Sequence, residues 1–120
     1  MKSKTFAIIP AYNEEKHINK VIKETRKYID EIVVVDDGSK DKTKEVAEKS
    51  KAVVLKHIIN LGKGATLKTG CDYAVKNKAD VIIAIDADAQ HDTKEIPKFL
   101  ESIKNSDIVL GYRKPSKHMP

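Results

Sequence analysis

The sequence predicts an α/β protein in which helices cover both faces of a mostly parallel sheet. Short apolar runs recur along the 120 residues, and their Val- and Ile-rich cores do not alternate apolar with polar residues, which is typical of strands buried on both faces. Segments with apolar residues at helical spacing separate these runs. The resulting βαβαβαβαβ order predicts a layered domain with right-handed crossovers.

The expected strands are bounded by polar or turn residues. They are Thr5 to Pro10, Glu31 to Asp36, Ala52 to Lys56, Asp80 to Asp86 and Asp107 to Gly111.

The expected helices each show one apolar face. The faces are Ile18, Val21, Ile22, Thr25, Tyr28 and Ile29; then Val46, Ala47 and Ser50; then Leu67, Cys71, Ala74 and Val75; then Ile96, Phe99, Leu100 and Ile103. Asp41 is expected to cap the second helix, and Asp92 with Glu95 forms a capping box before the fourth. Because Pro97 removes a backbone donor, the fourth helix is expected to begin nearer Ile96.

Length and composition predict one globular domain over residues 1–113, followed by a loose tail over residues 114–120. Hydrophobic residues make up 40 % of the chain, which is too much for a disordered protein. Apolar runs such as Val81 to Ile85 are far shorter than the roughly 20 residues of a membrane helix, and also too short for a signal peptide. The single Cys71 excludes an internal disulfide and predicts a cytoplasmic location.

The net charge of +5 does not indicate a nucleic-acid partner. Arg26 and Arg113 are the only arginines, and the lysines are interleaved with acidic residues along the whole chain. Base and phosphate readers favour Arg forks and stacking aromatics, which this chain lacks. A solvated, lysine-rich surface with a modest attraction for anionic ligands explains the charge better.

Polar residues collect where the expected strands end. Parallel sheets bind ligands at this edge, so the segments 10–15, 36–41, 60–64 and 86–92 are candidate site segments. Three of them are acidic and would repel one another unless a cation or ligand donors lay between them.

The pair Asp86-x-Asp88 is the sharpest candidate. Alternate side chains leaving a strand point to one side, so both carboxylates can face one ion. Oxygen ligands suit Mg²⁺ or Mn²⁺, and Gln90 and His91 follow closely. The alternative interpretation of the pair alone is that Asp86 ends the strand and Asp88 caps a turn.

The neighbouring segments have structural alternatives as well. One carboxylate of Asp36 and Asp37 is expected to brace the turn, and the other to hold a nucleobase or ribose. Gly62-Lys63-Gly64 lacks the pattern of a phosphate-binding Walker loop. Its structural interpretation is a tight turn into the next helix, with the Lys63 side chain in solvent. His57 is expected to end a strand.

Taken together, four ordered motifs resemble the inverting glycosyltransferases of family 2, which have the Rossmann-like, three-layer GT-A fold. The motifs are Pro10-Ala11-Tyr12-Asn13-Glu14-Glu15, Val33 to Asp41 with Thr43, Asn60-x-Gly62-Lys63-Gly64, and Asp86-Ala87-Asp88-x-Gln90-His91-Asp92. Within that family the chain is most similar to the polyprenyl-phosphate sugar synthases.

The resemblance implies a role for each site residue. Substrate-binding residues would be Pro10, Tyr12, Asn13, Glu14, Val34, Asp36, Asp37, Lys63 and Ala87, with Asp36 reaching the base and Val34 or Val35 beside it. Asp86 would approach the ribose and the metal shell. Asp88 and Gln90 would coordinate the Mg²⁺ or Mn²⁺ that bridges the donor diphosphate, and Arg113 would lie near the phosphates. Catalysis is thus assigned to Asp86, Asp88 and Arg113.

The resemblance further implies a GDP- or UDP-linked sugar as donor and a lipid phosphate as acceptor. A phosphate is already ionised near neutral pH and needs no general base, which agrees with a chain that ends before the family's usual base. Excess lysine favours the anionic inner face of a membrane. The domain resembles family members cut after the Asp86-x-Asp88 half, so a homo-oligomer or a partner subunit is expected.

Two other functions stay open at this stage. The first is a sugar-nucleotide-binding module without turnover. The second is a haloacid-dehalogenase-like phosphatase, which would also use Asp86-x-Asp88 but wants Thr or Val where this chain has Gln90.

Overall fold

The computed structural model describes residues 3–88, 93–102 and 108–109 of the chain. In these residues five parallel strands form one sheet in the order β3-β2-β1-β4-β5. The strands are β1 (Thr5–Ala11), β2 (Glu31–Asp37), β3 (Val53–His57), β4 (Val81–Ala84) and β5 (Ile108–Val109). The α/β class and the parallel sheet are therefore confirmed.

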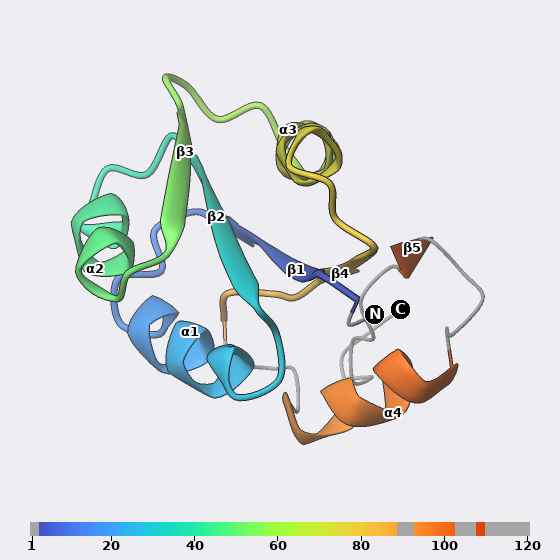
Figure 1. Cartoon of the computed structure of the whole chain (residues 1–120). Coiled ribbons are helices and arrows are strands. Elements are labelled where there is room, and N and C mark those ends of the chain that lie inside the picture. The colour runs from blue at the N-terminus through green and yellow to red at the C-terminus, as the bar shows by residue number, and fades with distance from the viewer. Residues whose placement is uncertain (1–2, 89–92, 103–107, 110–120) are drawn as a thin grey trace, which may run out of the picture.

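Helices cover both faces of this sheet, so the domain has three layers (Figure 1). The helices are α1 (Ile18–Arg26), α2 (Thr43–Lys49), α3 (Lys63–Lys76) and α4 (Ile96–Ser102), with a 3-10 turn, η1 (Thr93–Glu95), directly before α4. α1 and α2 pack on one face together with Ile96 and Leu100 of α4. α3 packs on the other face.

The alternation of side chains along the strands divides the core in two. Ala7, Ile9 and Val34 point towards α1 and α2, whereas Ile8 and Val33 point towards α3. All of these residues are fully buried. The absence of polar residues from the strand interiors is thus explained by burial on both faces.

Several expected details differ in the structure. β4 ends at Ala84, two residues before Asp86, although the Ile85 N–H still donates to the Ile8 carbonyl at 2.9 Å. The Asp41 carboxylate accepts from the Thr43 N–H in the first turn of α2 at 2.9 Å and so caps this helix as expected, although Lys42 is the residue directly before the helix.

The buried face of α3 also differs from the expected one. It is centred on Thr66, Gly70 and Ala74, with Leu67 and Cys71 half-buried at its margin, and Val75 is exposed. The small Gly70 lets the helix approach the sheet, which a hydrophobicity pattern does not register. The fourth helix begins at Ile96, as expected from Pro97. Asp92, Ile103 and the tail over residues 114–120 lie outside the described residues.

Candidate functional site

A cavity of about 340 Å³ opens where the strands end and α3 begins. Most of the predicted site residues lie in its wall: Pro10, Tyr12, Glu14, Asp37, Lys63, Asp86, Ala87 and Asp88. Ala11, Asn60, Gly62 and Thr66 line it as well. Segments far apart in the sequence therefore meet at this edge of the sheet, because parallel strands all present their carboxyl ends there.

Asp86 and Asp88 both line this cavity, as their spacing predicts. Asp86 is largely buried, with 14 % of its side chain exposed, and its carboxylate accepts from the Lys63 ammonium at 2.7 Å. Two carboxylates facing one cavity offer the hard oxygen donors that Mg²⁺ and Mn²⁺ prefer, so the residues present fit such an ion. Within the described residues no group of three or more His, Cys, Asp or Glu forms a complete metal site.

The remaining residues of this predicted centre cannot be placed. Gln90, His91 and Arg113 lie outside the described residues, so their assignments stay predictions.

Asp37 braces the loop over residues 58–62, which leads from β3 into α3. Its carboxylate accepts hydrogen bonds from the backbone N–H groups of Leu61 and Gly62, each at 2.8 Å. Gly62 has a φ of +98°, a conformation that glycine adopts readily. The carboxylate thus holds the turn that delivers Lys63 to the cavity wall.

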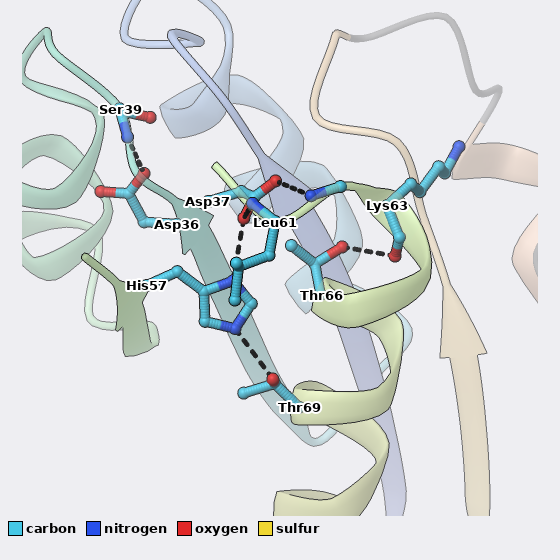
Figure 2. A network of polar contacts seen from close by, with 9 residues as sticks. Asp36, Asp37, Ser39, His57, Leu61, Lys63, Thr66 and Thr69 are labelled. Carbon is cyan, nitrogen blue, oxygen red and sulfur yellow. Dashed lines mark hydrogen bonds and ion pairs between the residues drawn. The ribbon is translucent and has the colours of Figure 1, made fainter. Parts of the chain in front are cut away.

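His57 lies between Asp37 and α3 and holds the Asp37 carboxylate in place, as Figure 2 shows. Its Nδ1 lies 2.8 Å from the Asp37 carboxylate and its Nε2 lies 2.9 Å from the Thr69 hydroxyl of α3. Burial raises the pKa of Asp37, but the hydrogen bonds from Leu61, His57 and Gly62 and the charge of His57 outweigh it and hold that pKa below its ordinary value. Asp37 is therefore a fixed anion at the back of the cavity.

Asp36 lies on the opposite side of β2 and is 1 % exposed. Its Oδ1 accepts from the Ser39 N–H at 2.9 Å, which braces the turn after the strand (Figure 2). Its Oδ2 is buried and has no hydrogen-bond partner among the described residues. A buried carboxylate oxygen without a donor is costly. Asp36 is not among the residues that line the cavity, so its expected contact with a base stays a prediction.

Asn13 joins two loops rather than lining the cavity. Its N–H donates to the Ser39 hydroxyl at 2.8 Å and its side-chain oxygen accepts from the Lys40 N–H at 2.9 Å. The same two loops are joined again where the Glu14 N–H donates to the Thr43 hydroxyl at 2.8 Å. Asn13 therefore acts on the site through the position of the Tyr12 and Glu14 loop.

Val34 does not reach the cavity. Its side chain is fully buried in the core between the sheet and α1, because it occupies a strand-interior position. Val34 is absent from the lining of the cavity, and its implied place beside a nucleobase stays a prediction.

The sequence alone does not indicate the places of two residues that shape the site. His57 ends a strand, as expected, but also supports Asp37, and Thr66 lines the cavity. The signal for His57 was its position at the end of a strand beside the one that carries Asp37, which the parallel register pairs directly with it.

The comparisons with known proteins agree with this geometry. Residues 6–119 match the model of glycosyl transferase family 2. A UDP-N-acetylglucosamine–dolichyl-phosphate N-acetylglucosaminyltransferase of Methanococcus voltae is 37 % identical over an alignment of 139 positions. The alignment covers 96 % of this chain and 55 % of the relative. A dolichol-phosphate mannosyltransferase of Pyrococcus furiosus is 36 % identical over 116 residues, covering 92 % and 33 %.

The chain spans about half the length of the first curated relatives it matches, 49 % and 53 % for two proteins of unassigned function from Methanocaldococcus jannaschii. Among solved structures, glucosyl-3-phosphoglycerate synthase from Mycobacterium tuberculosis, in complex with Mn²⁺, UDP and glucosyl-3-phosphoglycerate, superposes with a TM-score of 0.70 and 25 % identity. That match covers 86 % of this chain and 40 % of the synthase.

Proposed function

Because the chain belongs to glycosyl transferase family 2, we propose that it binds a nucleoside-diphosphate sugar in the described cavity and transfers the hexose, with inversion, to a polyprenyl phosphate. The observation that supports this most is the convergence of Tyr12, Lys63, Asp86 and Asp88 on one cavity at the sheet edge. GDP- and UDP-linked sugars are both compatible with these residues.

The nucleotide would lie across the ends of β1 and β2. Tyr12 is 43 % exposed at the cavity wall and offers an aromatic face to a base. Asp36, at the end of β2, would accept from a base N–H through Oδ2, which has no partner among the described residues. Asp86 would accept from the ribose hydroxyls, and Lys63 would attract the diphosphate.

Asp88 and Gln90 would coordinate a divalent cation. Asp86 would lie near this cation without being assigned as its direct ligand. A bound Mg²⁺ or Mn²⁺ supplies neutralisation of the charge that develops on the leaving diphosphate. The M. tuberculosis neighbour was solved with Mn²⁺ and UDP, which supports this part of the proposal.

The residues of the chain would orient the donor so that the acceptor oxygen attacks the anomeric carbon from the face opposite the diphosphate. The carbon–oxygen bond to the diphosphate breaks as the new bond forms. Lys63 and Arg113 would stabilise the departing charge. A phosphate acceptor brings its own ionised oxygen, so no proton has to be removed by a side chain.

A sugar-nucleotide-binding module without turnover is the second candidate. It needs only the donor cavity, whose wall the described residues form. The family match leaves the phosphatase alternative without support.

The donor site is tested by calorimetry with several nucleoside-diphosphate sugars, with and without Mn²⁺. Asp88→Asn removes a charged ligand while keeping the side-chain shape, so it should weaken binding in Mn²⁺ and change little without it. Asp72→Asn, on the exposed face of α3, is the matched control. Equal binding by Asp88→Asn and wild type in both conditions would refute the metal assignment.

The acceptor is tested with labelled donor offered to a polyprenyl phosphate, a sugar alcohol and phosphoglyceric acid in parallel. Label in the lipid fraction supports the proposal. Label found only in a water-soluble product contradicts it, and donor binding with no product in any arm favours the binding module.

Two further proposals concern the cellular location of the chain and its protein partners. The chain would work in the cytoplasm, at the inner membrane surface where a lipid phosphate is available. None of the helices in the described ranges has both the length and the apolar character to span a bilayer. A homo-oligomer or a partner subunit, checked by light scattering, remains a proposal.

A further inference from the structure

The loop over residues 58–62 exposes an unusual amount of apolar surface. Ile58 is 95 % exposed, Ile59 64 % and Leu61 56 %, so three of the five exposed large apolar side chains in the described residues share this loop. Single exposed aliphatic residues are ordinary, but a cluster marks an interaction surface. The loop joins β3 to α3 at the carboxyl edge of the sheet (Figure 1).

The backbone of this loop is fastened to the domain. Asp37 holds the N–H groups of Leu61 and Gly62. Gly38 lies so close that a Cβ there would come within 2.7 Å of the Ile59 carbonyl carbon. The isoleucine side chains are therefore presented outwards by a braced loop.

The loop after β2, which approaches this apolar tip at Gly38, carries exposed lysines. Asp36 and Asp37 are 1 % and 4 % exposed and point inwards. Lys40 and Lys42, in the loop that carries Gly38, are exposed. Acidic side chains turned in and lysines turned out leave a cationic rim beside an apolar tip, which is the composition of surfaces that bind anionic membranes.

We propose that this loop docks the domain on an anionic membrane by inserting Ile58, Ile59 and Leu61 among the lipids, with Lys40 and Lys42 against the headgroups. A second copy of the chain fits less well, because two cationic rims of a protein with net charge +5 would repel each other. Asn60 and Gly62 of the same loop line the cavity, so docking would bring the cavity mouth to the bilayer. The purpose of docking rests on the proposed lipid-phosphate acceptor.

Vesicle co-sedimentation tests the proposal without donor or acceptor, so its result is independent of glycosyl transfer. The chain should bind vesicles of three parts phosphatidylcholine to one part phosphatidylglycerol and bind pure phosphatidylcholine much more weakly. The double variant Ile58→Ser, Ile59→Ser should lower the partition coefficient about tenfold or more. Lys40→Gln with Lys42→Gln should lower it by a similar factor, and only at low salt.

The matched controls lie at the other end of α3, which ends at the opposite edge of the sheet. Val75→Ser removes a side chain that is 63 % exposed, and Lys76→Gln removes an exposed charge. Both should bind like wild type, and circular dichroism should show every variant folded, since each changed side chain is exposed. Equal binding by the loop variant and Val75→Ser would overturn the proposal. So would a loop variant that alters only the oligomeric state in light scattering.

Discussion

Lys63 and Asp86 form the contact in the cavity that bears most directly on ligand binding. The ammonium lies 2.7 Å from the carboxylate, with 56 % of the Lys63 side chain exposed. A cation entering near Asp86 must compete with this ammonium, whereas a diphosphate gains from it. The same lysine therefore opposes one ligand and favours the other.

We predict that Lys63→Gln shifts the two affinities in opposite directions. Mn²⁺ alone should bind more tightly and the donor without metal more weakly, each by a few fold, because a half-exposed ion pair contributes only about 0.2–1 kcal/mol. Calorimetry measures both. Lys68→Gln breaks the exposed pair with Asp72 at 2.9 Å and should change neither. Weaker binding of both ligands by Lys63→Gln would show that the pair does not oppose the metal.

His57 illustrates how a residue outside the cavity shapes it. We predict that His57→Phe destabilises the chain by about 1–3 kcal/mol, because it leaves Thr69 and Asp37 each short of a buried hydrogen-bond partner. Donor affinity should fall as well, since Asp37 sets the loop before Lys63. Urea unfolding and calorimetry measure the two effects.

The control for this variant is His17→Phe. His17 has a side chain that is 51 % exposed and bonds to Glu14, so its loss should stay within about 0.5 kcal/mol. If His57→Phe unfolds at the same urea concentration as His17→Phe, the hydrogen bonds of His57 do not contribute to the free energy of unfolding.

At the scale of elements, the approach of α3 to the sheet depends on Gly70. A Cβ at this position would overlap the side chain of Ile8, which is fully buried in β1. A Cβ at Gly64, in the first turn of the same helix, would instead point into open space, with no neighbouring atom within 4 Å. Substituting alanine at Gly64 therefore tests helix propensity alone, whereas the same change at Gly70 also tests the packing against Ile8.

We predict that Gly70→Ala destabilises the chain whereas Gly64→Ala is neutral or stabilising. Overpacking costs about 1–3 kcal/mol, which exceeds the roughly 1 kcal/mol that alanine gains over glycine in a helix. Urea midpoints of the two variants measure the difference. A Gly70→Ala protein at least as stable as Gly64→Ala would mean that α3 moves away from Ile8 freely.

The elements were predictable from sequence because burial on two faces leaves a continuous Val and Ile signal, as in β2. The carboxylate pair was predictable because Asp86 and Asp88 follow closely on a buried strand, although β4 ends at Ala84 and both residues lie beyond the strand itself. The buried face of α3 was not predictable from apolar spacing, because two of its residues are not apolar side chains. Gly70 is buried because its small size lets the helix approach Ile8, and Thr66 is buried at the cavity wall. The position of Val34 close to Asp36 in the sequence did not indicate that its side chain is buried in the core against α1.

At the scale of the whole molecule, two hydrogen-bonded carboxylates, those of the buried Asp37 and the half-buried Asp41, hold together the loops that form the site. Asp37 braces the loop before α3. Asp41 accepts from the Thr43 N–H at 2.9 Å and from the Glu15 N–H at 3.2 Å, which ties the loop after β1 to the start of α2. Burial raises the pKa of Asp41, but these hydrogen bonds and that of the Thr43 hydroxyl hold it below its ordinary value.

These lowered pKa values predict an acid-sensitive fold. Both carboxyl groups have an ordinary pKa of 3.8 and a lower one in the folded chain. The unfolded chain therefore binds protons first as the pH falls, and their contribution to stability, complete above the ordinary pKa, is lost as the pH drops through the lowered values. Urea unfolding between about pH 6 and about pH 3 should show this loss. Asp37→Asn should be less stable than wild type at neutral pH and lose less stability on acidification, because it has one fewer carboxylate to protonate. A variant that keeps the full acid dependence of the wild type would place that dependence in other groups.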